Sequence, residues 1–234
     1  MATDIVPELL EKIQREFNTK ISRNKKIQRI QEMIDNGTAT YEQAYEFAQE
    51  VGQTLSSVLQ AHIDSEVLPD GHMYFNIADR ILNPTLQTNH VMVATASAEI
   101  QELLNKQAGL GLKGIQPELN QPRIKSIIER IVQEELFDDV SWIIGEPIVN
   151  FTQSVVDDTL KANVDFQGKS GLHPKLIRVA HASDPCDWCQ QMEGTYKYPN
   201  VPAGVFGRHD RCRCTVEYDP GDVRRQNVWT KEWR

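Results

Sequence analysis

The stretch CDWCQQMEGTYKYPNVPAGVFGRHDRCRC, from Cys186 to Cys214, holds all four cysteines of the 234-residue chain. Cys186 and Cys189 form a C-x2-C pair, and after 19 residues the motif H-x2-C-x-C adds His209, Cys212 and Cys214. A C-x2-C pair can place two sulfurs about 2.3 Å from one zinc ion, and a second short pair from a distant turn can complete the tetrahedron. The spacing therefore predicts a zinc site.

Five potential ligands compete for four positions in such a site. We favour Cys186, Cys189, His209 and Cys212, because Cys212 and Cys214 on an extended strand would hold their side chains too far apart. Cys214 is then a buried strand residue and the alternate fourth ligand, while a site of four cysteines that leaves His209 outside stays open. Two disulfides and simple free thiols are the competing interpretations. The N-terminus shows no secretory signal, and thiols in a reducing compartment more often serve metals than disulfides.

The sequence predicts a structural rather than a catalytic metal, because a catalytic zinc needs an open position for water. Pro185 and the first cysteine pair match half of the zinc nucleobase deaminase signature, but none of the six histidines begins the required H-x-E motif. No G-x-S-x-G elbow or phosphate-binding loop occurs. Asp157 and Asp158 are contiguous and are interpreted as surface carboxylates, not as an acid and base pair. We therefore expect no enzyme.

Helical periodicity dominates the chain up to about residue 165, with apolar residues at spacings of three and four. Asn83-Pro84 is expected to divide two helices, because the residue before proline disfavours helical geometry. Tyr74 and Phe75 are interpreted as core residues. The predicted helices cover residues 4–35, 40–63, 72–82, 85–107, 122–137 and 147–163.

The last part of the chain has a different pattern. Residues 176–181 are a short strand candidate, and residues 214–218 alternate with the period of a half-buried strand. We therefore expect an α+β fold: a predominantly α-helical body over residues 1–165 and a small, zinc-stapled, β-containing unit over 166–234.

A hinge between helices is expected at residues 108–117, AGLGLKGIQP. Its glycines have the G-x-G-x-x-G spacing of a dinucleotide-binding loop, which requires a strand before the glycines and a helix directly after them. Here a helix precedes and Pro117 follows, so the segment is interpreted as a flexible linker.

The chain is acidic, with 25 Lys and Arg against 33 Asp and Glu and a formal net charge of -8. This disfavours indiscriminate binding to phosphate backbones. No apolar run approaches the ~20 residues of a membrane span. Residues 11–30 are locally basic, and they are interpreted as a solvated helix face or, alternatively, as a weak local contact to DNA or an acidic partner. The residues of that candidate contact are Lys20, Arg23, Lys25, Lys26 and Arg29.

Three stretches between Gly145 and Arg234 occur together: GEPIVNFTQSVVDDTLKANVDFQ, the CDWCQQMEGTYKYPNVP knuckle, and RHDRCRCTVEYDPGD with the trailing QNVWTKEW. In combination they resemble the minor capsid, or head morphogenesis, proteins of tailed bacteriophages, the Mu F-like group. The resemblance covers about 90 residues. Asp210 departs from the family pattern, which usually has proline after the histidine.

The resemblance implies a structural virion protein, made in the host cytoplasm and located in the inner head or portal region. Its implied partners are the phage portal and the major capsid protein, its implied roles include DNA packaging or ejection, and a homo-oligomer is compatible with them. Trp229 and Trp233 are candidate anchors into a partner, although a tail folded back on its own domain is equally consistent.

Two other functions compete with this expectation. The first is a DNA-associated ejection or packaging factor, which would bind phosphates in a steeply salt-dependent way. It would use the basic helix face together with Arg208, Arg211, Arg213, Arg224 and Arg225. The second is a zinc- or NAD-dependent effector enzyme, which would need an open metal position or a deep polar pocket.

Overall fold

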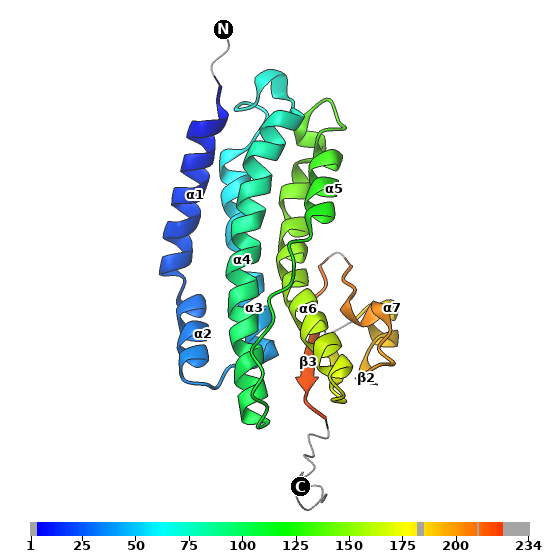
Figure 1. Ribbon diagram of the computed structural model, residues 1–234. Helices are drawn as coiled ribbons and strands as arrows, with labels where there is room; N and C mark the ends of the chain where they lie inside the picture. The colour runs from blue at the N-terminus through cyan, green and yellow to red at the C-terminus, as the bar shows by residue number, and fades with distance from the viewer. Residues whose placement is uncertain (1–3, 182–184, 210, 222–234) are drawn as a thin grey trace, which may run out of the picture.

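The computed structural model describes residues 4–181, 185–209 and 211–221. The fold is mostly helical, with a small antiparallel sheet near the C-terminal end, which confirms the coarse α+β expectation (Figure 1). Its elements in chain order are α1 (Val6–Arg23), α2 (Lys25–Asp35), α3 (Tyr41–His62), η1 (Pro69–Gly71), α4 (Phe75–Gln107), α5 (Gln121–Ile131), η2 (Phe137–Asp139), η3 (Ser141–Ile144), α6 (Glu146–Lys169), β1 (Lys175–Val179), α7 (Asp187–Gln191), β2 (Gly194–Lys197), η4 (Ala203–Phe206) and β3 (Thr215–Asp219).

The three longest helices, α3, α4 and α6, pack against one another and form the centre of a bundle, with α1 and α2 along one side (Figure 1). Helices α3 and α6 approach very closely at Gly52, where a Cβ would lie 3.0 Å from the Thr152 side chain. Thr152 also accepts a hydrogen bond of 2.7 Å from Asn89 of α4. Both contacts are buried, so the three helices are fixed relative to one another. No helix among the described residues combines the length and apolarity of a membrane span.

The single helix predicted over residues 4–35 is wrong, because the chain forms α1 and α2 with a break at Asn24. The backbone of Asn24 has φ -74° and ψ 111°, and its side chain accepts hydrogen bonds from the amides of Lys26 and Ile27. Asparagine is a preferred N-cap residue. The apolar periodicity of the segment conceals this cap.

The helix break predicted at Asn83-Pro84 is also wrong, because α4 continues through Pro84. The neighbouring residues Ile81, Leu82 and Leu86 are fully buried, and Thr85 donates a hydrogen bond of 2.8 Å to the carbonyl of Ile81. Helical stability in proteins comes mainly from tertiary packing, and the burial on both sides of Pro84 outweighs its local preference.

Residues 110–120 have no regular secondary structure and run back along the bundle (Figure 1). Ile115 exchanges two hydrogen bonds, of 2.9 and 2.8 Å, with the side chain of Asn163. Gly114 lies so close to α4 that a Cβ would stand 1.8 Å from the carbonyl oxygen of Ala98. The expected linker is therefore attached to the helices that it follows.

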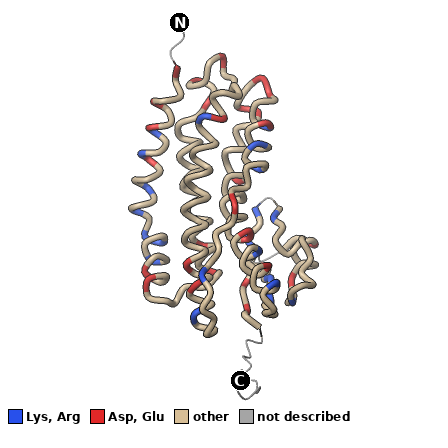
Figure 2. The backbone as a smooth tube through the Cα atoms, in the orientation of Figure 1, with Lys and Arg blue, Asp and Glu red and all other residues tan. Residues whose placement is uncertain are grey.

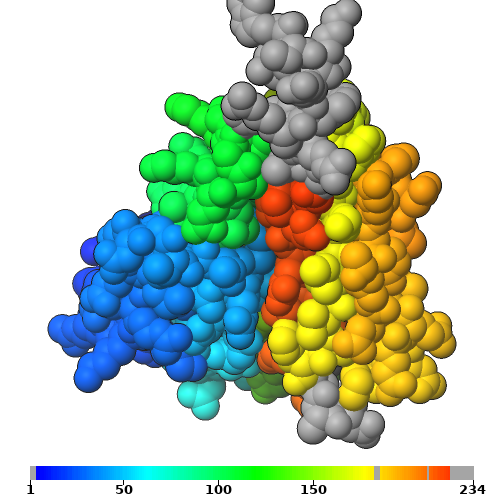
Figure 3. All heavy atoms as spheres, turned by 90° about the horizontal axis from the view of Figure 1, so that it is seen from below, coloured from blue at the N-terminus to red at the C-terminus, as the bar shows by residue number. Residues whose placement is uncertain are grey.

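The sheet has the order β2-β1-β3, and both neighbours pair antiparallel to β1. β3 lies between β1, with which it pairs, and the N-terminal helices, where it contacts α3 (Figure 3). The hydroxyl of Tyr218 donates a hydrogen bond of 2.6 Å to Gln167 of α6. Leu176 and Val216 of the sheet join the same apolar core as the helices. The expected boundary at residue 165 falls inside α6, which continues to Lys169.

Candidate metal centre

The first cysteine pair is positioned by the short helix α7. Cys186 is its N-cap residue and Cys189 lies in its first turn. Residues three apart share a helix face, so both sulfurs point toward the same side. Cys189 is buried and Cys186 is exposed.

The second group, His209, Cys212 and Cys214, comes from the loop between η4 and β3. This loop turns at Arg211, which has a left-handed φ of 55°. The amide of Cys212 donates a hydrogen bond of 3.2 Å to the carbonyl of His209. The turn directs these side chains toward α7.

The five predicted ligands converge. His209 Nε2 lies 2.9 Å from Cys189 Sγ and 3.4 Å from Cys186 Sγ, and these three ligand atoms all lie within 4.8 Å of one another. The sulfurs of Cys189, Cys212 and Cys214 form a second such group. A tetrahedral zinc with 2.3 Å bonds sets its sulfurs about 3.8 Å apart. The four cysteines are free thiols, so the cluster has the size and the donors to hold a metal ion.

The argument against Cys214 as a ligand is wrong. We expected Cys212 and Cys214 to stand too far apart on an extended strand, but their sulfurs lie within 4.8 Å of each other. The reason is that β3 begins only at Thr215, so both cysteines precede the strand. Cys214 Sγ is also 3.2 Å from Cys189 Sγ.

A buried arginine from β1 lies beside the thiols. Arg178 is 1% exposed, and its guanidinium donates to the carbonyl of Val205 and to Cys212 Sγ, the latter at 3.9 Å, while it stacks 5.0 Å from the Trp188 ring centroid. Among the described residues, it forms no ion pair with a carboxylate. A buried cation requires a counter-charge, and the sulfur of Cys212 is the group in position to supply it as a thiolate.

Three of the thiols have displaced pKa values, and neighbours other than Arg178 cause most of these shifts. A hydrogen bond from the Cys214 thiol, together with the nearby charge of Arg208, holds the pKa of Cys212 below its ordinary value. The same hydrogen bond and burial raise the pKa of Cys214, while burial raises the pKa of Cys189. The thiolate is the form that binds metals, so Cys212 is prepared to act as a ligand.

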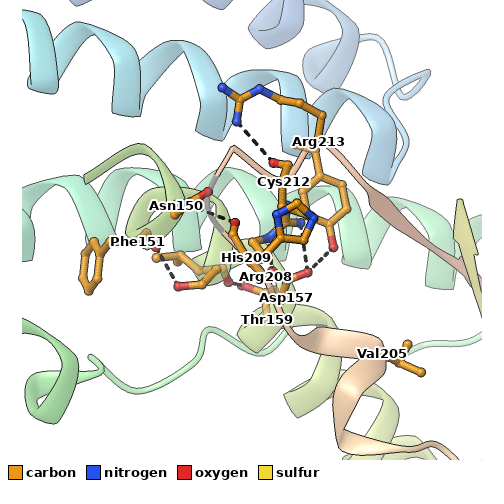
Figure 4. Close-up of polar contacts among 12 residues, drawn as sticks. Asn150, Phe151, Asp157, Thr159, Val205, Arg208, His209, Cys212 and Arg213 are labelled. Carbon is orange, nitrogen blue, oxygen red and sulfur yellow. Dashed lines mark hydrogen bonds and ion pairs between the residues drawn. The ribbon is translucent and has the colours of Figure 1, made fainter. Parts of the chain in front are cut away.

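A second buried arginine joins the loop between η4 and β3 to the bundle. We call this loop, residues 207–214, the metal loop because it carries three of the candidate ligands. Arg208 Nε and Nη2 both donate to the carboxylate of Asp157 in α6, and the Tyr45 hydroxyl of α3 donates to the same carboxylate at 2.6 Å (Figure 4). The interpretation of Asp157 as a surface carboxylate is therefore wrong, since its side chain is 1% exposed. Helical periodicity does not predict this burial, because most faces of α6 are buried and several of its polar side chains are buried with them.

Two further contacts attach the same loop to α6. Asn150 Nδ2 donates to the backbone carbonyl of His209 at 3.3 Å (Figure 4), and Arg213 forms an ion pair of 2.8 Å with Glu146. The loop is thus attached to the N-terminal half of α6.

The predicted nucleic-acid contacts have different environments. Arg208 is buried against Asp157, so it does not form part of an accessible basic face. Lys20 pairs with Glu16 at 2.9 Å and Lys26 with Glu50 at 2.6 Å. Both of these paired lysines are exposed, as are Arg23, Lys25, Arg29 and Arg211. The predicted contacts Arg224 and Arg225, and the candidate partner anchors Trp229 and Trp233, lie outside the described part of the chain.

Sequence reasoning missed Arg178, Tyr45 and Trp188. A signal for Arg178 was present, because it occupies the same face of the alternating strand KLIRV as buried Leu176. An arginine in such a buried register indicates a fixed counter-charge nearby. Tyr45 and Asp157 are 112 residues apart in sequence, and nothing local connects them.

Comparisons with protein families, with curated proteins and with solved structures find no match for this chain. The class of the site therefore rests on its own geometry, which is that of a thiol-rich cluster able to hold a metal.

Proposed function

We propose that the cysteine and histidine cluster binds one structural zinc ion. Soft thiolate and imidazole donors suit zinc, and a site with four protein ligands leaves no position for a catalytic water. The observation that carries the proposal is the position of Arg178, a fully buried cation that contacts Cys212 Sγ. A zinc ion bound by three or four thiolates keeps a net negative charge, which this cation offsets. In this role the chain is not an enzyme.

Two ligand sets are possible, and they differ in the residue at the fourth position. Either His209 completes a site with Cys186, Cys189 and Cys212, or Cys214 completes a site of four cysteines. Cobalt(II) in place of zinc reports the donors, because each bound thiolate contributes a sulfur-to-metal absorption band. His209→Asn abolishes the tetrahedral spectrum in the first case, whereas Cys214→Ser abolishes it in the second.

For the biological role, we put forward a minor capsid or head morphogenesis protein of a tailed bacteriophage, located in the inner head or portal region. Two observations support it. The residues that carry the resemblance, from Gly145 onward, include the metal cluster and α6. The buried Arg208 and Asp157 pair joins the two, so the metal loop forms a rigid surface on the helical body for the portal or the major capsid protein.

Mass spectrometry of purified phage particles tests this role. Cells that carry the encoding genome are induced, particles are purified by density, and the chain is quantified before and after triggered DNA ejection. The proposal expects a few copies per particle and cross-links to the portal or the capsid protein. Absence of the chain from intact particles would contradict it.

A DNA-associated packaging factor is the second candidate, favoured by the exposed side chains of Arg23, Lys25 and Arg29. Binding to duplex DNA at low salt, with an affinity that falls steeply as salt rises, supports this candidate. Replacing the three residues by glutamine removes that binding if they form the contact.

A further inference from the structure

One end of the bundle carries most of the exposed apolar surface. Five of the seven exposed large hydrophobic side chains of the described residues occur in residues 63–75 and 132–145, which we call the acidic end. The two loops contact each other through Ser65 and Asp138 at 2.9 Å, and through His72 and the Glu135 carbonyl at 3.0 Å. The five side chains are Val67, Tyr74, Phe75, Leu136 and Trp142.

Tyr74 and Phe75 were expected in the core, and this expectation is wrong. Their side chains are 42% and 55% exposed, whereas the neighbouring Met73 is 1% exposed. The chain leaves η1 and enters α4 at this point, so only one of the three successive side chains faces inward.

A groove of about 380 Å³ opens at the same end. Ile63, Phe137 and Ile144 contribute buried apolar surface to it. The exposed ring of Trp142 and the polar side chains of Gln60, Asp64, Asp138 and Ser141 complete the lining. A groove with apolar walls and two carboxylates fits a side chain that is apolar and adjacent to a positive charge.

The charge of this end has one sign. Residues 63–75 and 132–145 contain seven Asp and Glu and no Lys or Arg, and Figure 2 shows the acidic residues gathered there. One of them, Glu134, pairs with Arg130 at 2.8 Å. Such a surface attracts a basic partner and repels an acidic one.

The C-terminal sequence VRRQNVWTKEWR, residues 223–234, has the complementary composition. It contains four Lys and Arg against one Glu, so 4 minus 1 gives +3, and it includes Trp229 and Trp233. Tryptophan and arginine are the residues that most often dominate binding energy. The charged and the apolar features of this segment thus both match the acidic end.

The segment of the same chain cannot reach this surface with both tryptophans. Gly221 lies against His173, beyond the C-terminal end of α6, whereas Trp142 lies just before the first residue of that helix. The 24 residues of α6 rise about 36 Å. Trp229 follows Gly221 by eight residues, which span at most about 28 Å when fully extended. Trp229 can therefore contact an acidic end only on another copy.

We propose that residues 223–234 of one copy bind the acidic end of a second copy, with the tryptophans on the apolar groove and the basic residues against its carboxylates. The contact joins different surfaces of two identical chains, so it repeats and produces a ring or an open chain of copies. It goes beyond the proposed virion role and depends on neither the metal nor the phage assignment.

The test uses three full-length variants and sedimentation at low ionic strength. The tail variant is Trp229→Ala with Trp233→Ala, the end variant is Phe75→Ser with Trp142→Ser, and Val91→Ser is the control. Val91 is 54% exposed, like the end residues, but lies in the middle of α4. The wild type and the control are expected to self-associate with equal affinity, and this affinity should fall at high salt. Each double variant is expected to self-associate with an affinity at least about 30-fold lower.

A mixture of the two double variants gives the sharpest test of the proposed contact. One supplies an intact acidic end and the other an intact tail, so together they form a one-to-one dimer that grows no further. A synthetic peptide of residues 222–234 is expected to bind the tail variant with one-to-one stoichiometry. A wild type that stays monomeric at all concentrations, or a mixture that forms no dimer, overturns the proposal and leaves the tail to bind some other protein.

Discussion

Arg208 and Asp157 form a two-bond ion pair in which 2% and 1% of the side chains are exposed. Burial alone would lower the pKa of Arg208, but the carboxylate of Asp157 holds that pKa above its ordinary value. The guanidinium also lies 4.8 Å from the centroid of the Tyr45 ring. The arginine comes from the metal loop and the aspartate from α6. The pair therefore connects the candidate metal centre to the helical bundle through a fixed charge.

Removal of one member of this pair is expected to destabilise the whole fold. Asp157→Asn leaves the guanidinium of Arg208 buried without its counter-charge, which costs about 3–5 kcal/mol. Urea denaturation measures the loss. The matched control is Asp165→Asn in the same helix, where the partner Lys161 is 52% exposed and the expected change is below about 1 kcal/mol. Equal losses of unfolding free energy in the two variants would show that the buried pair stabilises the fold no more than an exposed pair does.

The second prediction concerns Arg178. Arg178→Met removes the buried cation beside Cys212 and is expected to weaken zinc binding by about 10- to 100-fold, the range for groups that support metal ligands. Competition with a colorimetric chelator measures the affinity. Lys175→Met is the control on the same strand, since its side chain is 40% exposed and pairs with Asp219 at 3.4 Å. Unchanged affinity in Arg178→Met would remove the argument that the arginine offsets a thiolate.

His90 gives the fold a defined pH dependence. Burial lowers its pKa below 6.5, and the ring contacts the carbonyl of Pro117 at 3.2 Å. Below pH 6.5 the unfolded chain therefore binds more protons at this site than the folded chain does, so stability falls as the pH falls. The unfolding free energy of the wild type minus that of His90→Gln should therefore decline as the pH falls below 6.5. The slope should be at most about 1.4 kcal/mol per pH unit. A difference that stays constant with pH contradicts the assignment.

The attachment of residues 110–120 can be tested with two glycines. Gly114→Ala places a Cβ 1.8 Å from the Ala98 carbonyl oxygen, and such overpacking costs about 1–3 kcal/mol or more. Gly111→Ala, in the same segment, has no atom within 4 Å of its Cβ and is expected to be neutral or stabilising by up to about 1 kcal/mol. Thermal unfolding of both variants measures the contrast. Two neutral substitutions would mean that the segment is a free linker.

The sequence predicted those features that depend on local pattern. The helical periodicity located the helical regions, although α5 ends at Ile131 and not at residue 137 as predicted. The cysteine and histidine spacing identified all five side chains that converge. The helix boundaries were predicted wrongly where tertiary packing or a capping hydrogen bond overrode the local sequence pattern. Pro84 lies inside a helix because buried neighbours hold it there, and Asn24 interrupts a helix that the apolar spacing alone would continue.

The rest of the site depends on contacts between remote segments. Asp157 and Arg208 are 51 residues apart, and Asp157 has a sequence environment like that of a surface carboxylate. The position of Cys214 beside Cys212 depends on where β3 begins, a difference of one residue that strand periodicity does not resolve. The alternation in KLIRV did contain the information that Arg178 is buried.

The central claim is that the thiol cluster holds one zinc ion, and the most direct measurement is elemental analysis of protein purified under reducing conditions. We expect one zinc per chain, and strong loss of zinc in Cys189→Ser, since Cys189 belongs to both groups of converging ligands. Absence of any stoichiometric metal from folded wild-type protein, with all four thiols reactive toward a thiol reagent, would contradict the account.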